Sequence, residues 1–281
     1  MKILDGKKVR DVISREIELE LKKLKTKPKL VIIQVGENPQ SSVYVKQKKI
    51  FGEKLGFEVE YIHLDNKISE YELISNINEL NLNKFVNGII VQLPLPKNIS
   101  ESKVTEAISY QKDVDGMNSK NIRALLEGSD YGFLPATTKG ILSLLDFYKI
   151  QIKGKKVVIV GRSLLVGRPT ALAFLNRDAT VTICHSHTKN LKGEIKSADI
   201  VISAIGKPNF IKKLHVKKGQ IIIDVGITKV KDQLLGDVDY KNVSKIVRAM
   251  TPVPGGVGPM TVISLFQNVL IAYKRQNQNV L

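Results

Sequence analysis

The sequence predicts an α/β protein with two domains, each built on a parallel sheet. The chain has 281 residues, which is long for one simple core and sufficient for two. Short apolar runs alternate with segments of helical spacing along the whole chain, a pattern typical of parallel sheets covered by helices. Because the alternation starts again after Gly154, a second sheet is expected there.

The first half contains apolar, strand-like runs separated by helical segments. A turn at Pro39 offers a start for the first helix, and Gly56 ends it. A turn at residues 115–116 follows the last apolar run, so we place the domain boundary near residues 118–121. The expected strands are residues 30–35, 57–64 and 88–93, and the expected helices are residues 41–55 and 70–82.

The second half repeats this pattern with more strands. Its first apolar run leads into a glycine-bearing turn and then into a helical segment. The expected strands are residues 157–160, 180–184, 200–204 and 221–225, and the expected helices are residues 169–176 and 261–274. Strands that alternate with helices in this way predict a second parallel sheet.

Charge narrows the function classes. The net charge is +17, and it comes from lysines that are spread along the whole chain without a basic tail. No aromatic residues interleave with the lysines, so solvated lysine faces explain the charge best. Attraction of an anionic substrate is also compatible with it, and a basic nucleic-acid-binding protein is the alternative from another class.

Other sequence features exclude further classes. Cys184 is the only cysteine, so no intramolecular disulfide can form. No apolar run reaches the roughly 20 residues that span a bilayer, and the first ten residues lack the apolar region of a signal peptide. The four histidines have no carboxylate or cysteine partners at ligand spacing. We therefore expect a cytoplasmic protein without a metal site or a membrane partner.

A candidate dinucleotide site follows the first strand of the second half. The run at residues 157–160 leads into Gly161, Arg162 and Ser163, and Gly167 precedes the next helix. Such a turn aims backbone N–H groups and the positive end of a helix at a pyrophosphate. The spacing is not G-x-G-x-x-G, so an ordinary glycine turn explains this segment about equally well when it is taken alone.

The end of the next strand favours NADP over NAD. An NAD site carries an acidic residue there for the ribose 2′-hydroxyl. Here the strand at residues 180–184 is followed by His185, Ser186 and His187, with no carboxylate. Arg162 can supply a charged donor and Ser186 a hydroxyl to a 2′-phosphate, although the two histidines are also explained as ordinary polar loop residues.

Several segments carry more specific information. They are Ser-Ser-Val-Tyr-Val-Lys-Gln-Lys at 41–48, Gly-Ile-Ile-Val-Gln-Leu-Pro-Leu-Pro at 88–96, Lys-Asp-Val-Asp-Gly at 112–116, Gly-Arg-Ser-x-x-Val-Gly-x-Pro at 161–169, Gly-Asp-Val-Asp at 236–239, and Thr-Pro-Val-Pro-Gly-Gly-Val-Gly-Pro-Met-Thr at 251–261. In this order, over nearly the whole chain, they resemble the signature segments of the methylenetetrahydrofolate dehydrogenase/cyclohydrolase family. The last run is too long to match by chance.

The resemblance implies a bifunctional enzyme of one-carbon metabolism. It would oxidise 5,10-methylenetetrahydrofolate to 5,10-methenyltetrahydrofolate with NADP and hydrolyse that product to 10-formyltetrahydrofolate. Hydride transfer to the nicotinamide requires positioning more than acid–base chemistry. Hydrolysis of the methenyl cation requires proton transfer.

The resemblance also assigns Lys48, Tyr44, Gln92 and Asp115 to catalysis and folate binding. Tyr44 and Lys48 are four residues apart, so on a helix they share one face. Tyr44 would stack on the aminobenzoyl ring, and Lys48 would transfer the proton with a pKa lowered by burial or by a nearby cation. Gln92 would hydrogen-bond the Lys48 amine. Asp115, by itself an ordinary turn residue, would accept two hydrogen bonds from the pterin.

Two further groups of residues follow from the resemblance. The proline- and glycine-rich loop would lie against the folate with its backbone, through Pro254, Gly255 and Gly258. The residues expected to bind NADP are Gly161, Arg162, Ser163, Gly167, Ser186 and Thr228.

The expected architecture is an N-terminal α/β folate domain and a C-terminal Rossmann-like domain. The folate-binding, catalytic domain would consist of residues 1–119 and 260–281, because the C-terminal helix would return to it. The NADP-binding domain would consist of residues 120–259. The resemblance implies a homodimer formed through the Rossmann-like domains.

Two departures from the family pattern stand out. Thr138 replaces a common proline, and Thr228 replaces a usual asparagine.

Two alternative functions also remain within enzyme chemistry. A dehydrogenase-only member of the same family is one, although the intact Lys48 speaks against it. An unrelated NAD(P)-dependent dehydrogenase is the other, and it leaves Tyr44, Gln92 and Asp115 without a role.

Overall fold

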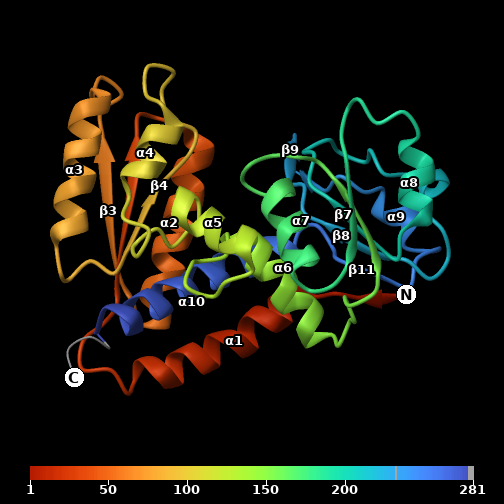
Figure 1. Ribbon diagram of the computed structural model, residues 1–281, viewed down its shortest axis with the longest axis horizontal. Coiled ribbons are helices and arrows are strands. Elements are labelled where there is room, and N and C mark those ends of the chain that lie inside the picture. Colours follow the sequence, from red (N-terminus) through yellow and green to blue (C-terminus); the bar gives the residue numbers. More distant parts are fainter. Residues whose placement is uncertain (232, 278–281) are drawn as a thin grey trace. The chain divides into compact units, whose positions relative to one another are not determined.

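The structure, a computed structural model, describes residues 1–231 and 233–277. It contains two parallel sheets with helices packed against them, so the prediction of a two-domain α/β protein is confirmed. Figure 1 shows the elements of both parts. Residues 278–281, which end the expected folate domain, lie outside the described residues. Within the described residues, no helix is long and apolar enough to cross a membrane.

Packing divides the chain into two compact units. The three-stranded unit consists of residues 13–136 and the chain from Leu265 onward. The six-stranded unit consists of residues 1–12 and 137–264. Two helices, α1 (Gly6–Leu21) and α10 (Val257–Asn277), therefore contribute to both units.

The sheet of the three-stranded unit is parallel and has the order β3-β2-β4. Its strands are β2 (Lys29–Val35), β3 (Glu58–Leu64) and β4 (Gly88–Val91). The central strand β2 is buried from Leu30 onward, which explains its nearly continuous apolar sequence. The helices that lie wholly in this unit are α2 (Pro39–Leu55), α3 (Glu70–Leu82), α4 (Glu101–Ala107) and α5 (Ser119–Glu127).

Apolar side chains from the helices cover this sheet. From α3, Leu73 and Ile77 pack into one cluster with Val31 and Ile89 of the sheet. The C-terminal part of α10 also packs here, because Phe266 lies with its ring centre 5.0 Å from that of Phe57. The expectation that the C-terminal helix returns to the first sheet is confirmed.

The six-stranded unit has a parallel sheet of order β1-β11-β8-β7-β5-β6. Its strands are β1 (Lys2–Ile3), β5 (Lys156–Val160), β6 (Thr180–Cys184), β7 (Ile200–Ser203), β8 (Ile221–Asp224) and β11 (Ala249–Met250). The strand order reverses between β5 and β7, and ligands of open α/β sheets bind at the carboxyl ends of the strands near such a point.

Helices and one hairpin complete the six-stranded unit. The helices are α6 (Ala136–Phe147), α7 (Gly167–Leu175), α8 (Leu191–Ser197), the 3₁₀ helix η1 (Lys213–His215) and α9 (Tyr240–Val243). Two short strands, β9 (Thr228–Val230) and β10 (Gln233–Leu235), pair antiparallel. Buried aliphatic side chains from β5, β7 and β8 form much of the core.

Two segments pack differently from the expected division of the chain. Lys2 and Ile3 pair with Ala249 and Met250, so the first residues join the six-stranded sheet. Residues 120–136 pack in the three-stranded unit. The expected ranges, 1–119 with 260–281 and 120–259, describe ligand-binding parts, and as such they remain a prediction.

Candidate functional site

A lysine and a glutamine meet at the carboxyl end of the three-stranded sheet. Lys48 lies on α2, and its Nζ donates a hydrogen bond of 3.1 Å to Oε1 of Gln92, the residue after β4. The Gln92 amide group donates in turn to the Leu93 carbonyl oxygen over 2.8 Å. These contacts leave Oε1 of Gln92 to accept from Lys48, so the amine is held in one place.

Burial changes the acidity of this lysine. The Lys48 side chain is partly exposed along its length, but its ammonium end is buried. This burial lowers the pKa of Lys48, while the negative charge of Asp115 opposes the shift. The amine is therefore closer to neutral at physiological pH than a surface lysine, as proton transfer requires.

The turn that carries Asp115 is fixed beside β4. The Lys112 carbonyl oxygen accepts a 2.8 Å hydrogen bond from the Ile89 N–H. Gly116 has a φ of +73°, and a Cβ there would lie 2.6 Å from the Phe133 carbonyl oxygen. Only glycine fits this close approach, so the backbone of the turn explains Gly116, the second residue of the Asp-Gly pair.

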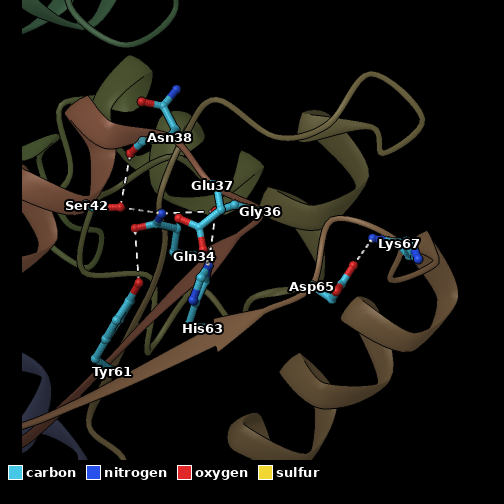
Figure 2. A network of polar contacts seen from close by, with 9 residues as sticks. All are labelled: Gln34, Gly36, Glu37, Asn38, Ser42, Tyr61, His63, Asp65 and Lys67. Atoms are coloured by element: carbon cyan, nitrogen blue, oxygen red, sulfur yellow. Dashed lines mark hydrogen bonds and ion pairs between the residues drawn. The ribbon is translucent and has the colours of Figure 1, made fainter.

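The start of α2 is held by a partly buried polar network around Gln34, which was not predicted from the sequence. Gln34 lies in β2 and donates to Ser42 Oγ over 2.9 Å and to the Gly36 carbonyl oxygen over 3.1 Å, while the Tyr61 hydroxyl donates to its Oε1 (Figure 2). Ser41 Oγ donates to the carbonyl oxygen of Leu93. The only signal in the sequence was a polar residue inside an apolar strand.

Tyr44 lies one helical turn before Lys48 on α2. Its side chain is 47% exposed, so a ring-shaped ligand can reach it. The structure thus joins Lys48 to Gln92 by a hydrogen bond, with Asp115 near enough for its charge to act on the Lys48 amine, and it leaves Tyr44 open on the same helix as Lys48.

In the six-stranded unit, the loop at residues 251–256, just before α10, rests on the start of α1. The Gly255 carbonyl oxygen accepts a 2.9 Å hydrogen bond from the Gly6 N–H, and a Cβ at Gly6 would collide with the Gly256 carbonyl oxygen. Gly255 has a φ of +108°, which favours glycine. Pro254 lies in the same loop. Gly258, which was expected in that loop, lies in the first turn of α10, and a Cβ there would meet Ile227 at 3.4 Å. Gly6 was not predicted from the sequence.

The glycine turn after β5 has a tightly packed backbone. Gly161 has a φ of +124°, and a Cβ there would collide with the Ala204 carbonyl oxygen. A Cβ at Gly167 would collide with the carbonyl oxygen of Gly161. Ser163 Oγ accepts from the N–H groups of Val166 and Gly167, so this hydroxyl stabilises the start of α7.

Arg162 and Ser186 follow neighbouring strands. Val160 of β5 pairs with Cys184 of β6, and the two exposed side chains each come two residues later.

The two departures from the family pattern, Thr228 and Thr138, have local hydrogen-bond partners. Thr228 Oγ1 donates to the Gly206 carbonyl oxygen over 3.2 Å, and the buried Thr138 hydroxyl hydrogen-bonds that of Thr170 on α7.

Two buried carboxylates tie together the loops after β7 and β8. Asp237 accepts from Ser203 Oγ and from the N–H groups of Ile205 and Lys207, at 2.8 to 3.0 Å. Asp224 accepts from the N–H groups of Asp237 and Val238, both at 3.0 Å. Burial raises the pKa of Asp224 to about 7, against these hydrogen bonds, and the nearby Asp237 charge adds to the increase. The described residues contain no group of side chains that could hold a metal ion.

The six-stranded sheet, with a glycine turn at a helix start beside the reversal of strand order, is of the Rossmann-like, dinucleotide-binding class. Family comparison matches residues 135–277 to the NAD(P)-binding domain of tetrahydrofolate dehydrogenase/cyclohydrolase, and residues 4–115 to its catalytic domain. The chain belongs to the tetrahydrofolate dehydrogenase/cyclohydrolase family.

Relatives with nearly the same length support this membership. The bifunctional protein FolD of Aquifex aeolicus is 46% identical over 278 residues, which cover 98% of this chain and 96% of the relative. The crystal structure of bifunctional FolD from Campylobacter jejuni has a TM-score of 0.97 at 42% identity, covering 98% of this chain and 99% of that chain. The FolD of Trypanosoma brucei, complexed with NADP cofactor and inhibitor, has a TM-score of 0.92 at 33% identity, covering 97% of both chains.

Proposed function

We propose that this chain oxidises 5,10-methylenetetrahydrofolate to 5,10-methenyltetrahydrofolate with NADP and hydrolyses that product to 10-formyltetrahydrofolate. The observation that carries the proposal is the buried Lys48 amine, held by Gln92 and close to the charge of Asp115, in a chain of this family. A dehydrogenase alone has no need of a lysine with a lowered pKa at this place. Relatives that match nearly the whole chain are named as bifunctional enzymes.

In the oxidation, the side chains of the three-stranded unit bind and orient the folate. The Asp115 carboxylate accepts hydrogen bonds from the amino and ring N–H groups of the pterin. Tyr44, exposed on α2, stacks on the aminobenzoyl ring. When it is bound, NADP supplies the hydride acceptor for the methylene carbon, so the protein contributes positioning rather than acid–base chemistry.

In the hydrolysis, Lys48 moves a proton. Its neutral amine takes a proton from the water whose oxygen adds to the cationic methenyl carbon, which gives a neutral carbinol. The proton is then passed to N5 as the N5–carbon bond breaks, and the carbinol O–H proton is released to solvent as the formyl C=O bond forms. The positive charge of the methenyl group favours the neutral amine still further. Gln92 keeps the amine in place through Oε1.

The glycine turn fits a dinucleotide. At both Gly161 and Gly167 a Cβ would collide with backbone oxygens, so the turn strongly favours bare backbone beside the N-terminus of α7. Backbone N–H groups at a helix start bind phosphate oxygens. Gly161, Ser163, Gly167 and Thr228 therefore form the cofactor-binding part of the proposal.

Within the NAD(P)-binding class, we assign NADP rather than NAD. Arg162 and Ser186 are exposed after the paired ends of β5 and β6, and no carboxylate lies at residues 185–188 to hold a free ribose 2′-hydroxyl. The Trypanosoma brucei relative that is complexed with NADP supports this choice.

The proposal includes a homodimer formed through the six-stranded units. Strand β6 is at one edge of that sheet, where its backbone groups can pair with a second copy, and Ile183 on it is 39% exposed. Light scattering at micromolar concentration should give the mass of a dimer, and a monomer alone would contradict it.

An absorbance assay with methylenetetrahydrofolate and NADP tests the whole function. The methenyl signal should form and then decay faster than it does in enzyme-free buffer. A signal that accumulates and decays only at the buffer rate would identify a dehydrogenase-only enzyme. No methenyl formation, together with salt-sensitive binding to DNA or RNA, would favour the nucleic-acid-binding alternative.

A further inference from the structure

Asp113 is a buried carboxylate that the proposed chemistry does not use. It lies two residues before Asp115 and is 1% exposed. Its Oδ2 accepts from the Asn118 N–H over 2.6 Å and from Nδ2 of Asn121 over 2.8 Å. The Met117 N–H donates to the same carboxylate.

All three donors follow Asp115 in the chain. The Asp113 side chain therefore reaches across the turn and ties its beginning to its end at Met117 and Asn118. The beginning of the turn is also fixed to the sheet, because Asp113 forms a parallel bridge with Ile89. Between these two anchors lies Asp115, whose backbone has little freedom left.

Asn121 strengthens the same closure from α5. Besides its bond to the carboxylate, its Nδ2 lies 3.1 Å from the Tyr110 carbonyl oxygen and 3.3 Å from that of Asp113. Its Oδ1 accepts from the Phe133 N–H. The amide of Asn121 thus uses both of its ends to hold the segment around the Asp115 turn.

A charge is a costly way to stabilise a turn in the protein interior. Burial raises the pKa of Asp113 to about 6, although the hydrogen bonds from Asn118, Asn121 and Met117 oppose the shift, and the negative charge of Asp115 adds to the increase. An asparagine would avoid this cost, but only one of its two end groups can accept. A carboxylate accepts at both oxygens, and three N–H groups at this turn require an acceptor.

We propose that Asp113 is a positioning residue for folate recognition, which acts by holding the 113–118 turn so that Asp115 faces the pterin. The inference rests on the proposed role of Asp115 in folate binding. It predicts that a substitution of Asp113 weakens folate binding only through Asp115 and leaves cofactor binding unchanged.

A double-mutant cycle in the full-length protein tests this. The variants are Asp113→Asn, Asp115→Ala and the double variant, and the measurements are KM for methylenetetrahydrofolate, KM for NADP and the dissociation constant of tetrahydrofolate. Asp113→Asn keeps the shape and replaces one carboxylate oxygen by an N–H₂ group, which cannot accept a hydrogen bond. Misplacement of Asp115 should raise the folate constants on the order of tenfold, with KM for NADP unchanged.

The decisive comparison is the Asp115→Ala background. There, Asp113→Asn should add no further loss of folate binding. An equal loss in both backgrounds, or an unchanged folate constant in the single variant, would overturn the proposal. If Asp115→Ala itself binds folate normally, the proposed role of Asp115 fails. If Asp115→Ala loses folate binding but Asp113→Asn gives an equal further loss in that background, only the positioning role of Asp113 fails.

Asn81→Ala controls for a general loosening of this region. Asn81 donates to the Ala107 carbonyl oxygen and accepts from the Ser109 N–H, so it holds the segment just before the turn. The Asn81→Ala variant should have a lower Tm and unchanged folate constants. A loss of folate binding as large as that of Asp113→Asn would refute the positioning role. Should Asp113→Asn be too unstable to assay, Asn121→Ala removes one donor, and its several-fold folate loss should likewise vanish in the Asp115→Ala background.

Discussion

The three-stranded unit and the six-stranded unit build their candidate sites from different parts of the chain. In the three-stranded unit the chemistry is carried by side chains, with Lys48 Nζ bonded to Gln92 and sensitive to the charge of Asp115. In the six-stranded unit it is carried by bare backbone at Gly161 and Gly167, where a Cβ does not fit. Each unit also has buried carboxylates: Asp113 in the three-stranded unit, and Asp224 and Asp237 in the six-stranded unit.

This difference determines which substitutions matter. Removing side-chain atoms should damage the first site, because its groups bind and react directly. Adding atoms should damage the second, because its N–H groups are useful only if a phosphate can approach them. The two sites should also fail separately, one for folate and one for cofactor.

The largest effect is expected for Lys48→Met. Loss of the proton-transferring amine should reduce hydrolysis of methenyltetrahydrofolate by roughly 100-fold or more, the usual range for general acid–base catalysis. Folate should still bind, because the methylene stem is retained. Lys49→Met is the matched control, since the Lys49 side chain is 42% exposed and forms a 3.9 Å ion pair with Glu53 on the same helix. If Lys48→Met hydrolyses the methenyl compound at the normal rate, the assignment is wrong.

Asp115→Ala comes next. It leaves two pterin donors without a charged acceptor, and such hydrogen bonds contribute about 1.5–3 kcal/mol each. Folate binding and activity should therefore fall steeply, while NADP binding stays nearly the same. Titration of both ligands by calorimetry measures this, and an equal loss for both would indicate a folding defect.

A change of Arg162 should alter cofactor choice. Its guanidinium can bind phosphate oxygens bidentately, which favours NADP by roughly 2–3 kcal/mol, or on the order of 100-fold. Arg162→Ala should weaken the binding of NADP and leave the binding of NAD almost unaffected. Ser186→Asp should move the cofactor preference further toward NAD. Equal specificity constants for NAD and NADP in the unmodified protein would contradict both assignments.

The smallest effect is expected for a single methyl group at Gly161. Gly161→Ala places it against the Ala204 carbonyl oxygen in a backbone of φ +124°, which should cost about 1–3 kcal/mol and raise the KM for NADP several-fold. Gly154→Ala is the matched control, because its φ is +72° but nothing lies within 4 Å. It should lose stability through backbone strain alone. A cofactor KM raised equally by both variants would argue against the backbone site.

The sequence predicted most strands of the two parallel sheets well because their apolar patterns are local, but it gave no expectation for several helices, α1 and α6 among them. The strand expected at 180–184 is β6 as observed, and the run at 88–93 contains β4 and, directly after it, Gln92. The strand β1 could not be predicted, because two residues carry no periodicity and its partner is β11, almost 250 residues later. Such long-range strand pairing cannot be seen in a local sequence pattern.

The candidate site was predictable in part for the same reason. Lys48 and Tyr44 share a helix, so their spacing was visible in the sequence. Their relation to Gln92 and Asp115 depended on a family resemblance, because it is made by tertiary contacts. The supporting residues Gln34, Gly6 and Asp113 gave little signal, since what distinguishes them is their burial or their close contact with distant backbone.

The most direct test of this account is the acidity of the Lys48 amine. An NMR titration of its ¹⁵N-labelled Nζ should give a pKa below the ordinary value of 10.5, because the ammonium end is buried. Since the negative charge of Asp115 opposes that shift, Asp115→Asn should lower the pKa of Lys48 further, and the inflection in the pH profile of hydrolysis should move to lower pH with it. A Lys48 pKa at 10.5 that does not respond to Asp115→Asn would contradict the account.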